Sequence, residues 1–214
     1  MIGWSEDRTR DAYDAVADTY ADHFTSTDAE LPVDLAMVDH FVALLADPKC
    51  VLDAGCGAGR MMPYLAARGC VVEGVDLSNE MVRRAGADHP QFPVAAASLA
   101  QLPFPESTFD GVLSWYSTIH SPDELIPQAL GESRRVLRLG GVALLGFQTG
   151  NEIRDVSDGY RRRGHDITLI RYSRTIAWMA RRLLEARMRP IVTMERAAVS
   201  GERDGQGFII AEAM

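Results

Sequence analysis

The sequence predicts an α/β fold with a doubly wound sheet of seven strands, mostly parallel and closed by a C-terminal antiparallel hairpin. Three observations predict it. Short apolar runs alternate with amphipathic helical segments between residues 50 and 147, which is typical of parallel strands joined by crossover helices. A glycine-rich turn follows the first of these runs directly. After residue 150 the alternation stops, and two strand-like runs joined by a turn-rich segment end the chain.

The length and composition suit one domain over residues 1–214. With 47% hydrophobic residues the chain can bury a core, and its net charge of −8 disfavours general affinity for nucleic acid. No apolar run reaches the roughly 18 residues that span a bilayer, and MIGWSEDRTRD at the start lacks the layout of a secretory signal. Together they predict no membrane or nucleic-acid partner. Three scattered cysteines suit a reducing cytoplasm, and a single lysine among 22 basic residues, with many alanines, indicates a GC-rich bacterial genome.

The first 47 residues are expected to form a helical cap. Apolar side chains recur at helical spacing over 13–24, and a second amphipathic helix begins at Pro32, a favoured first helical position. In the core over 48–150, a helix over 58–68 follows the glycine turn, and Ser78 caps the next one. The strands of this core are predicted at 50–54, 71–76, 92–96, 109–115 and 142–147.

The second half of the chain carries clear start and stop signals. Ser121, Pro122 and Glu124 read as a capping box and predict a helix that begins there and stops at Gly140-Gly141. Residues 151–172 are polar and arginine-rich, and an irregular segment beside the site is expected. The C-terminal part, 173–214, is predicted to hold one helix over 173–188 and a hairpin with strands at 190–199 and 206–212.

The segment VLDAGCGAGR carries the sharpest functional signal. Gly55, Gly57 and Gly59 lie between a strand and a helix, where permissive backbone angles let a ligand touch the main chain. Asp76 ends the next strand, 23 residues after Asp53, and a carboxylate there can accept hydrogen bonds from both hydroxyls of a ribose. Since doubly wound sheets bind ligands at this edge, the pattern predicts a cofactor that contains a nucleoside.

Two residues distinguish between cofactor classes. The dinucleotide fingerprint G-x-G-x-x-G/A needs a small residue where this chain has Arg60. Asp53 would repel a pyrophosphate but suit an ammonium group. S-adenosylmethionine has an ammonium, a sulfonium and no phosphate, so the charges favour it over NAD. An NAD-dependent oxidoreductase is the alternative enzyme class, and a non-catalytic S-adenosylmethionine-binding protein is a further alternative.

These segments resemble the class I S-adenosylmethionine-dependent methyltransferases, most of all the ubiquinone/menaquinone-biosynthesis-type group. The resemblance covers about 50–147 and rests on VLDAGCGAGR, VEGVDLSNEM, SLAQLPFPESTFDGVLSW and RVLRLGGVALLG, preceded by the leader YDAVADTYADHF. It implies a Rossmann-like sheet, S-adenosylmethionine as donor and S-adenosylhomocysteine as product. It also implies that O, N or C of a small-molecule acceptor is methylated.

The resemblance implies roles around the glycine turn. Asp53 would face the methionine ammonium of the cofactor, and Gly55 and Gly57 would let the backbone pack against it. Asp76 would hold the ribose diol.

Further residues would surround the adenine and the methionine end. The resemblance implies that Leu77 and Leu99 cover the two faces of the adenine, while Ser98 stands where LPF-type members carry an aspartate toward the adenine amino group. Tyr13 or Tyr20 would close over the methionine end, with packing within the helix as the alternative interpretation. The predicted cofactor contacts are Tyr20, Asp53, Gly55, Gly57, Arg60, Asp76, Leu77, Met81, Ser98, Leu99 and Trp115.

The acceptor is expected beyond the fourth strand, around WYSTIH. Methyl transfer is a displacement driven by the sulfonium, so the protein mainly positions the two reactants. His120 is the candidate base, because an unperturbed imidazole has a pKa of about 6.5. A loop histidine hydrogen-bonded near a helix start is the alternative interpretation.

Two further patterns bear on the acceptor. No [DNS]-P-P-[YFW] motif or Asp-Asp-Asn magnesium set is present, so a metal-independent enzyme for a small molecule is expected, as a monomer or homodimer. The arginine run 161–163 could bind a substrate anion, but a solvated charge run is the favoured interpretation.

Overall fold

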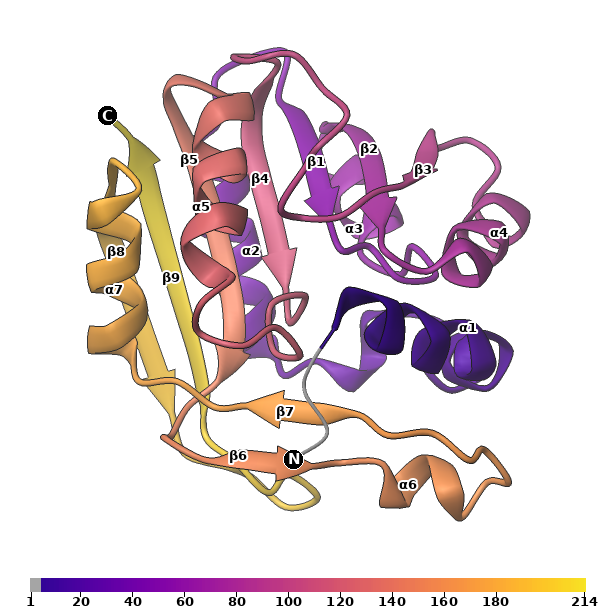
Figure 1. Cartoon of the computed structure of the whole chain (residues 1–214). Coiled ribbons are helices and arrows are strands. Elements are labelled where there is room, and N and C mark those ends of the chain that lie inside the picture. Colours follow the sequence, from indigo (N-terminus) through magenta and orange to yellow (C-terminus); the bar gives the residue numbers. More distant parts are fainter. Residues whose placement is uncertain (1–4) are drawn as a thin grey trace.

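A computed structural model of the chain describes residues 5–214, so the expected N-terminal cap is described from residue 5 onward. One seven-stranded sheet has the order β3-β2-β1-β4-β5-β9-β8 (Figure 1). Its first five members run parallel, whereas β9 is antiparallel to β5 and to β8, as the sequence predicts. The strands are β1 (Cys50–Ala54), β2 (Val71–Asp76), β3 (Val94–Ala96), β4 (Phe109–Trp115), β5 (Leu137–Gln148), β8 (Met188–Arg196) and β9 (Gln206–Ala213).

Helices cover both faces of this sheet because its central strands are apolar on both sides. Every residue of β4 is buried, and its side chains divide between two hydrophobic clusters. One cluster joins the sheet to α5 (Ile126–Val136) and α7 (Ile176–Glu185), and the other joins it to α2 (Pro32–Leu44) and α3 (Met62–Ala66). Strand β2 continues into α4 (Asn79–Asp88), where the Ser78 hydroxyl accepts the Met81 N–H at 3.1 Å, which confirms the predicted cap.

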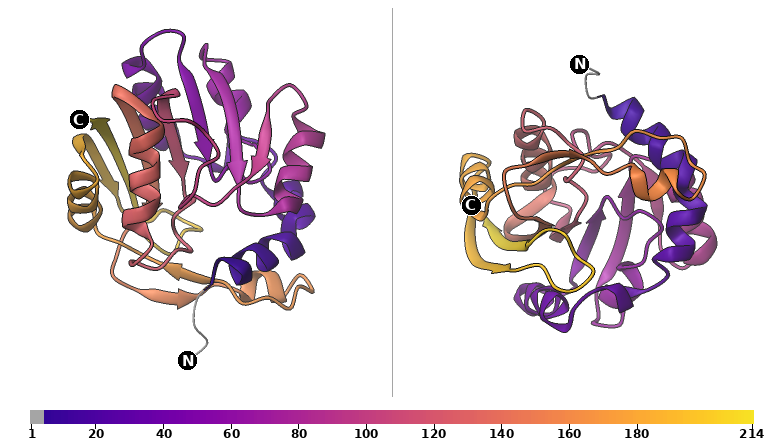
Figure 2. Two further views of the ribbon diagram at one scale, coloured as in Figure 1. Left: turned by 45° about the horizontal axis from the view of Figure 1, so that its top comes forward. Right: turned by 90° about the horizontal axis from the view of Figure 1, so that it is seen from below.

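Two segments cross the carboxyl ends of the parallel strands (Figures 1 and 2). The first is α1 (Glu6–His23), which packs on α4 and is joined by a short 3₁₀ turn (Thr27–Ala29) to α2. The second holds α6 (Asp158–Arg161) and a small sheet of β6 (Ile153–Asp155) and β7 (Ile170–Tyr172), where an irregular segment was expected. Ala12 and Val16 of α1 pack against Ile167 and Leu169 of the second segment, so the two touch each other.

The predicted capping box is wrong. The helix α5 begins at Ile126, with Pro127 in its first turn, and residues 121–125 form turns instead. The reason is tertiary: the buried Arg174 donates to the carbonyls of Thr118 and Ser121 and pairs with the Asp123 carboxylate. This guanidinium holds the segment before α5 in a non-helical form.

The Gly140-Gly141 pair does not end a helix either. Helix α5 stops at Val136, and β5 starts at once with Leu137 and contains both glycines. Phe109 pairs with Leu137 but Gly111 pairs with Val142, so the glycines lie where the register shifts. Gly140 has a φ of +76°, which a glycine adopts without strain, and the pair therefore forms an irregularity within the strand.

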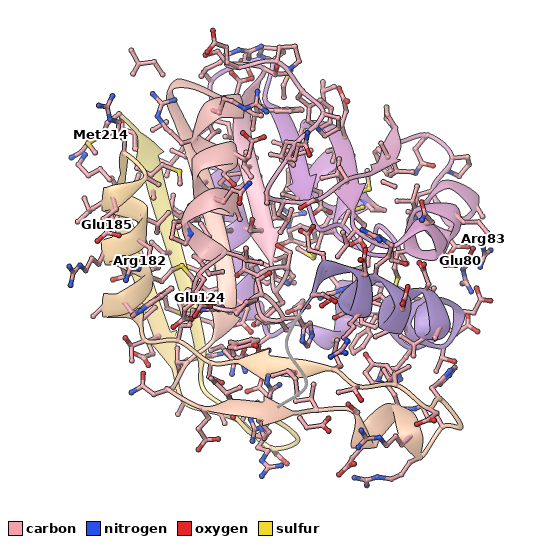
Figure 3. The ribbon with its side chains drawn as sticks, viewed as in Figure 1. Glu80, Arg83, Glu124, Arg182, Glu185 and Met214 are labelled. Carbon is pink, nitrogen blue, oxygen red and sulfur yellow. The ribbon has the colours of Figure 1, made fainter. Side chains whose placement is uncertain are left out.

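Charged side chains occupy the outer helix faces. Arg83 pairs with Glu80 on α4 and Arg182 with Glu185 on α7, each across one helical turn (Figure 3). Such exposed pairs contribute little to stability, because water and salt screen the two charges. Among the described residues, none of the helices is both long and apolar enough to cross a membrane.

Candidate functional site

A cavity of about 630 Å³ lies at the carboxyl ends of the central strands, roofed by α1 and the 153–172 segment. Its size falls within the ~300–1,000 Å³ of typical small-molecule sites. The structure brings eleven of the twelve predicted site residues to its wall. They are Tyr20, Asp53, Gly55, Gly57, Arg60, Asp76, Leu77, Met81, Leu99, Trp115 and His120.

Ser98 does not line the cavity. Its hydroxyl donates to the carboxylate of Glu6, and it accepts the Ala100 N–H at 3.0 Å. Glu6 itself lies in the cavity wall, in the first turn of α1. The carboxylate on this side of the site therefore comes from the N-terminal helix, which the sequence analysis did not anticipate.

The glycine turn after β1 is held together by the acid at the end of β2. The Gly57 N–H donates to Asp76 Oδ2 at 2.8 Å, and the Ser78 N–H donates to Asp76 Oδ1 at 2.9 Å. Gly55 has a φ of +84°, and a Cβ there would lie 2.2 Å from the Cβ of Ser117. Gly55 is thus required by the close approach of the β4–α5 loop as well as by its backbone angle.

Asp53 is a buried acid without a partner. Its side chain is 1% exposed, and Oδ2 makes no hydrogen bond with any residue between 5 and 214. Burial raises the pKa of this carboxyl to about 7; Arg60 opposes the rise and Asp76 adds to it. An unpaired carboxyl in this position favours a cationic group as its neighbour.

Arg60 is not available as a free cation. Its guanidinium donates to the Glu30 carboxylate, and both side chains are largely buried. The cavity wall therefore gains no net charge from this pair. Around the glycine turn the uncompensated groups are acidic, which disfavours a pyrophosphate there.

His120 is a buried residue of the cavity wall, in the loop after β4. Its Nδ1 lies 2.6 Å from the carbonyl oxygen of Ile170, and since a carbonyl only accepts, Nδ1 carries the proton. Burial lowers the pKa of this imidazole to about 4, partly offset by the hydrogen bond to Ile170. The ring is therefore neutral at pH 7, and its lone pair is on Nε2.

Arg174 fixes the loop that carries His120. Its Nη1 donates to the Thr118 carbonyl at 3.1 Å, its Nη2 donates to the Ser121 carbonyl, and its Nε donates to Asp123 at 2.9 Å. The side chain is only 3% exposed. It lies 54 residues beyond His120 in the chain, so no local pattern could reveal this role.

Unpaired polar atoms concentrate at this cavity. Of eight buried side-chain N and O atoms that lack a hydrogen-bond partner among the described residues, six belong to cavity-lining side chains. Native proteins satisfy most buried polar groups, so such a cluster is typical of a ligand site. The six are Asp53 Oδ2, Trp115 Nε1, Ser117 Oγ, Gln148 Oε1, Arg171 Nε and Gln206 Oε1.

The loop between β8 and β9 forms a part of the site that the sequence analysis missed. Glu202, Arg203 and Asp204 line the cavity, although only a turn was expected there. Strand β9 runs antiparallel to β5, so it starts beside the carboxyl end of β5. The loop before β9 therefore lies at the same edge of the sheet as the cavity, and the expected antiparallel hairpin was the signal that could have placed it there. By contrast, the three arginines at 161–163 are exposed, and they lie outside this cavity wall.

Comparisons with known proteins agree with this geometry. Residues 51–141 match a family model described as a methyltransferase domain. The chain is 33% identical over 129 residues to a malonyl-[acyl-carrier protein] O-methyltransferase from Pseudescherichia vulneris, which covers 59% of this chain and 51% of that protein. The chain spans about half the length of the curated relatives it matches.

Solved structures are similar over most of the chain. A protein from Methanosarcina mazei described as a SAM-dependent methyltransferase superposes with a TM-score of 0.68 at 20% identity, over 83% of this chain and 97% of the other. The [4+2]-cyclase SpnF superposes with a TM-score of 0.73 at 14% identity, over 99% and 97% of the two chains. At these identities the likeness concerns the fold.

Proposed function

We propose that this chain, which carries a class I methyltransferase domain related to S-adenosylmethionine-dependent enzymes, transfers the methyl group of S-adenosylmethionine to a small-molecule acceptor. The methyl group would go to O, N or C of that acceptor. The observation that supports this most is the unpaired, buried carboxyl of Asp53 beside the glycine turn. The three cysteines are free, in keeping with a reducing cytoplasm.

The cavity wall suits this cofactor better than a dinucleotide. Asp53 would receive the ammonium of the methionine moiety. Each oxygen of Asp76 accepts one backbone N–H and has a further lone pair for a ribose hydroxyl. Leu77, Leu99 and Met81 offer apolar surface for the adenine. At the glycine turn a pyrophosphate would meet Asp53 and Asp76, while Arg60 there is already paired with Glu30, which disfavours the NAD-dependent alternative.

His120 would act as the base for an acceptor that loses a proton. The bound cofactor supplies an electrophilic methyl carbon, and the S–CH₃ bond breaks as the bond to the acceptor forms. His120 donates its Nδ1 proton to the Ile170 carbonyl, so Nε2 is the basic atom of the ring. Arg174 keeps the ring in place by holding the loop on both sides of it. Turnover of an acceptor by this methyl transfer distinguishes an enzyme from a protein that only binds the cofactor.

Thermal stabilisation tests the cofactor directly. A ligand that binds only the folded state adds about 2.7 kcal/mol to the free energy of unfolding at 100 times its Kd. We expect the melting temperature, followed by calorimetry, to rise with S-adenosylmethionine and with S-adenosylhomocysteine but not with NAD or NADH. A rise in melting temperature with NADH alone would favour the NAD-dependent oxidoreductase over the methyltransferase.

Asp76→Asn is expected to weaken S-adenosylhomocysteine binding while the protein stays folded. The amide keeps one oxygen for the Gly57 or Ser78 N–H but turns its NH2 toward the other N–H, so the loss of stability should be near the ~1–3 kcal/mol of one unsatisfied buried donor. Isothermal titration would report the affinity and circular dichroism the fold. Unchanged affinity in the folded variant would show that the ribose lies elsewhere.

A further inference from the structure

One end of the cavity wall, formed by β7 and the loop between β8 and β9, carries Arg171 and Arg203, and Arg154 of β6 lies beside Arg171. Asp204 in the β8–β9 loop accepts two hydrogen bonds from Arg154 Nη2, at 2.5 and 2.7 Å, and a further one from Arg171 Nη2. The two arginines are register partners on β6 and β7, so they lie side by side. Both side chains are 17% exposed. Two largely buried guanidinium groups thus share one carboxylate.

The charges at this end do not balance. Arg171 and Arg203, which is next to Asp204, both line the cavity, although Arg203 is exposed and so contributes less than the two largely buried arginines. Glu202, the other acid of the loop, is hydrogen-bonded to Arg196 at 2.6 Å. Glu152 lies 3.9 Å from Arg154 but is 72% exposed, so it compensates little. Burial and the neighbouring arginines lower the pKa of Arg171, which reflects this crowding of positive charge.

Unused hydrogen-bonding capacity faces the same region. Nε of Arg171 makes no hydrogen bond within the described part of the chain, although the side chain lines the cavity. Gln148 and Gln206 line the wall nearby, at paired positions of β5 and β9, each with an unpaired amide atom. Exchanging the O and N of an amide would present a donor there instead. A guanidinium with spare donors is the usual partner of a carboxylate or a phosphate.

We propose that Arg171, assisted by Arg203, binds a carboxylate or phosphate group of the methyl acceptor. This inference rests on the proposed function, because it assigns this end of the cavity to the acceptor and the acidic end to the cofactor. Arg171 directly follows Ile170, whose carbonyl holds the His120 ring. An anionic group on Arg171 therefore places the rest of the acceptor close to the candidate base.

A purely structural role is the competing explanation, since Arg171 also ties β7 to the β8–β9 loop through Asp204. Pairs of probes that differ in charge distinguish this structural role from the binding of an acceptor anion. Protein saturated with S-adenosylhomocysteine would be titrated, at constant ionic strength, with phenylacetate against phenylacetamide and with phenyl phosphate against phenol. We expect at least one anion to bind at least tenfold more tightly than its neutral partner, and the two pairs distinguish carboxylate from phosphate.

The variant Arg171→Gln should lose at least tenfold in affinity for that anion and keep its S-adenosylhomocysteine affinity. Arg161→Gln is the matched control, because Arg161 is exposed and pairs with Asp155 and Asp158 outside the cavity wall. Equal or absent binding of both members of each pair, or an equal loss in both variants, would overturn the inference. Turnover, read as release of S-adenosylhomocysteine from an acceptor panel, is a separate measurement. Its absence would count against the proposed function and leave the binding result intact.

Discussion

Replacing Asp53 with asparagine is expected to stabilise the free protein and to abolish most of its affinity for S-adenosylhomocysteine. The carboxyl is buried, and Oδ2 has no hydrogen-bond partner among residues 5–214, so its ionisation opposes folding. We expect the free energy of unfolding at pH 8 to rise by about 2–4 kcal/mol, because each unit of the rise in the folded-state pKa from 3.8 to about 7 costs ~1.4 kcal/mol. We expect affinity to fall by at least about 30-fold, since losing one member of a buried charge pair costs about 2 kcal/mol or more.

The pH dependence of this gain follows from the direction of the pKa shift. The folded-state pKa is raised to about 7 from an ordinary value of 3.8. Below pH 3.8 both the folded and unfolded states hold the proton, so the wild type has no penalty. Between 3.8 and 7 the unfolded state ionises first, and stability falls as the pH rises. The advantage of Asp53→Asn should therefore grow from pH 5 to pH 8, by about 2–3 kcal/mol.

Asp34→Asn provides a control of opposite sign. Asp34 is also 1% exposed, but its two oxygens accept hydrogen bonds from Arg196 at 2.7 and 2.6 Å. Neutralising it leaves a buried guanidinium less well compensated, so stability should fall. Urea denaturation of the three proteins at pH 5 and pH 8 measures both effects. If Asp53→Asn were less stable than the wild type at pH 8, or bound the cofactor with unchanged affinity, the assignment of Asp53 to the cofactor site would be wrong.

Replacing His120 with asparagine is expected to lower kcat by about 10²–10⁴-fold for an acceptor whose proton must be removed. The asparagine amide can still donate to the Ile170 carbonyl in place of Nδ1, but it offers no basic lone pair in place of Nε2. Cofactor affinity should be unchanged. The measurement is the release of S-adenosylhomocysteine at saturating donor and acceptor.

The pH profile of the wild type adds an independent test. Because burial lowers the pKa of His120 to about 4, the ring is a neutral base throughout pH 5–8. We expect kcat to stay flat over that range and to fall only as the pH approaches 4. A limb near pH 6.5, or full activity in His120→Asn, would show that another group takes the proton.

Much of the architecture follows from local sequence patterns. The apolar runs at 50–54, 71–76 and 109–115 form strands with those bounds, because buried parallel strands have continuous apolar sequences. The α/β fold is confirmed by the solved structures, and the match of residues 51–141 to a methyltransferase domain agrees with the resemblance. Most of the predicted site residues meet at one cavity, since the ends of parallel strands share one edge of the sheet.

The features that local patterns did not predict depend on contacts between distant segments. Ser121 is a residue type that favours the N-cap of a helix, but here its carbonyl accepts a hydrogen bond from Arg174. Glu6 and the β8–β9 loop reach the cavity only through the placement of α1 and the order of the strands. The arginines of β6 and β7 become a pair only when those strands align. Each case needs the three-dimensional arrangement as well as the residue types.

The two segments above the cavity share a hydrophobic cluster of their own. It is formed by Ala12 and Val16 from α1 with Ile167 and Leu169, apart from the two clusters that hold the sheet. Separating these segments would expose this cluster, break the hydrogen bond between Thr19 and His165, and leave the packing of the strands intact. A local opening of that kind would cost less free energy than global unfolding, and it would give ligands a route to the cavity while the strands stay packed.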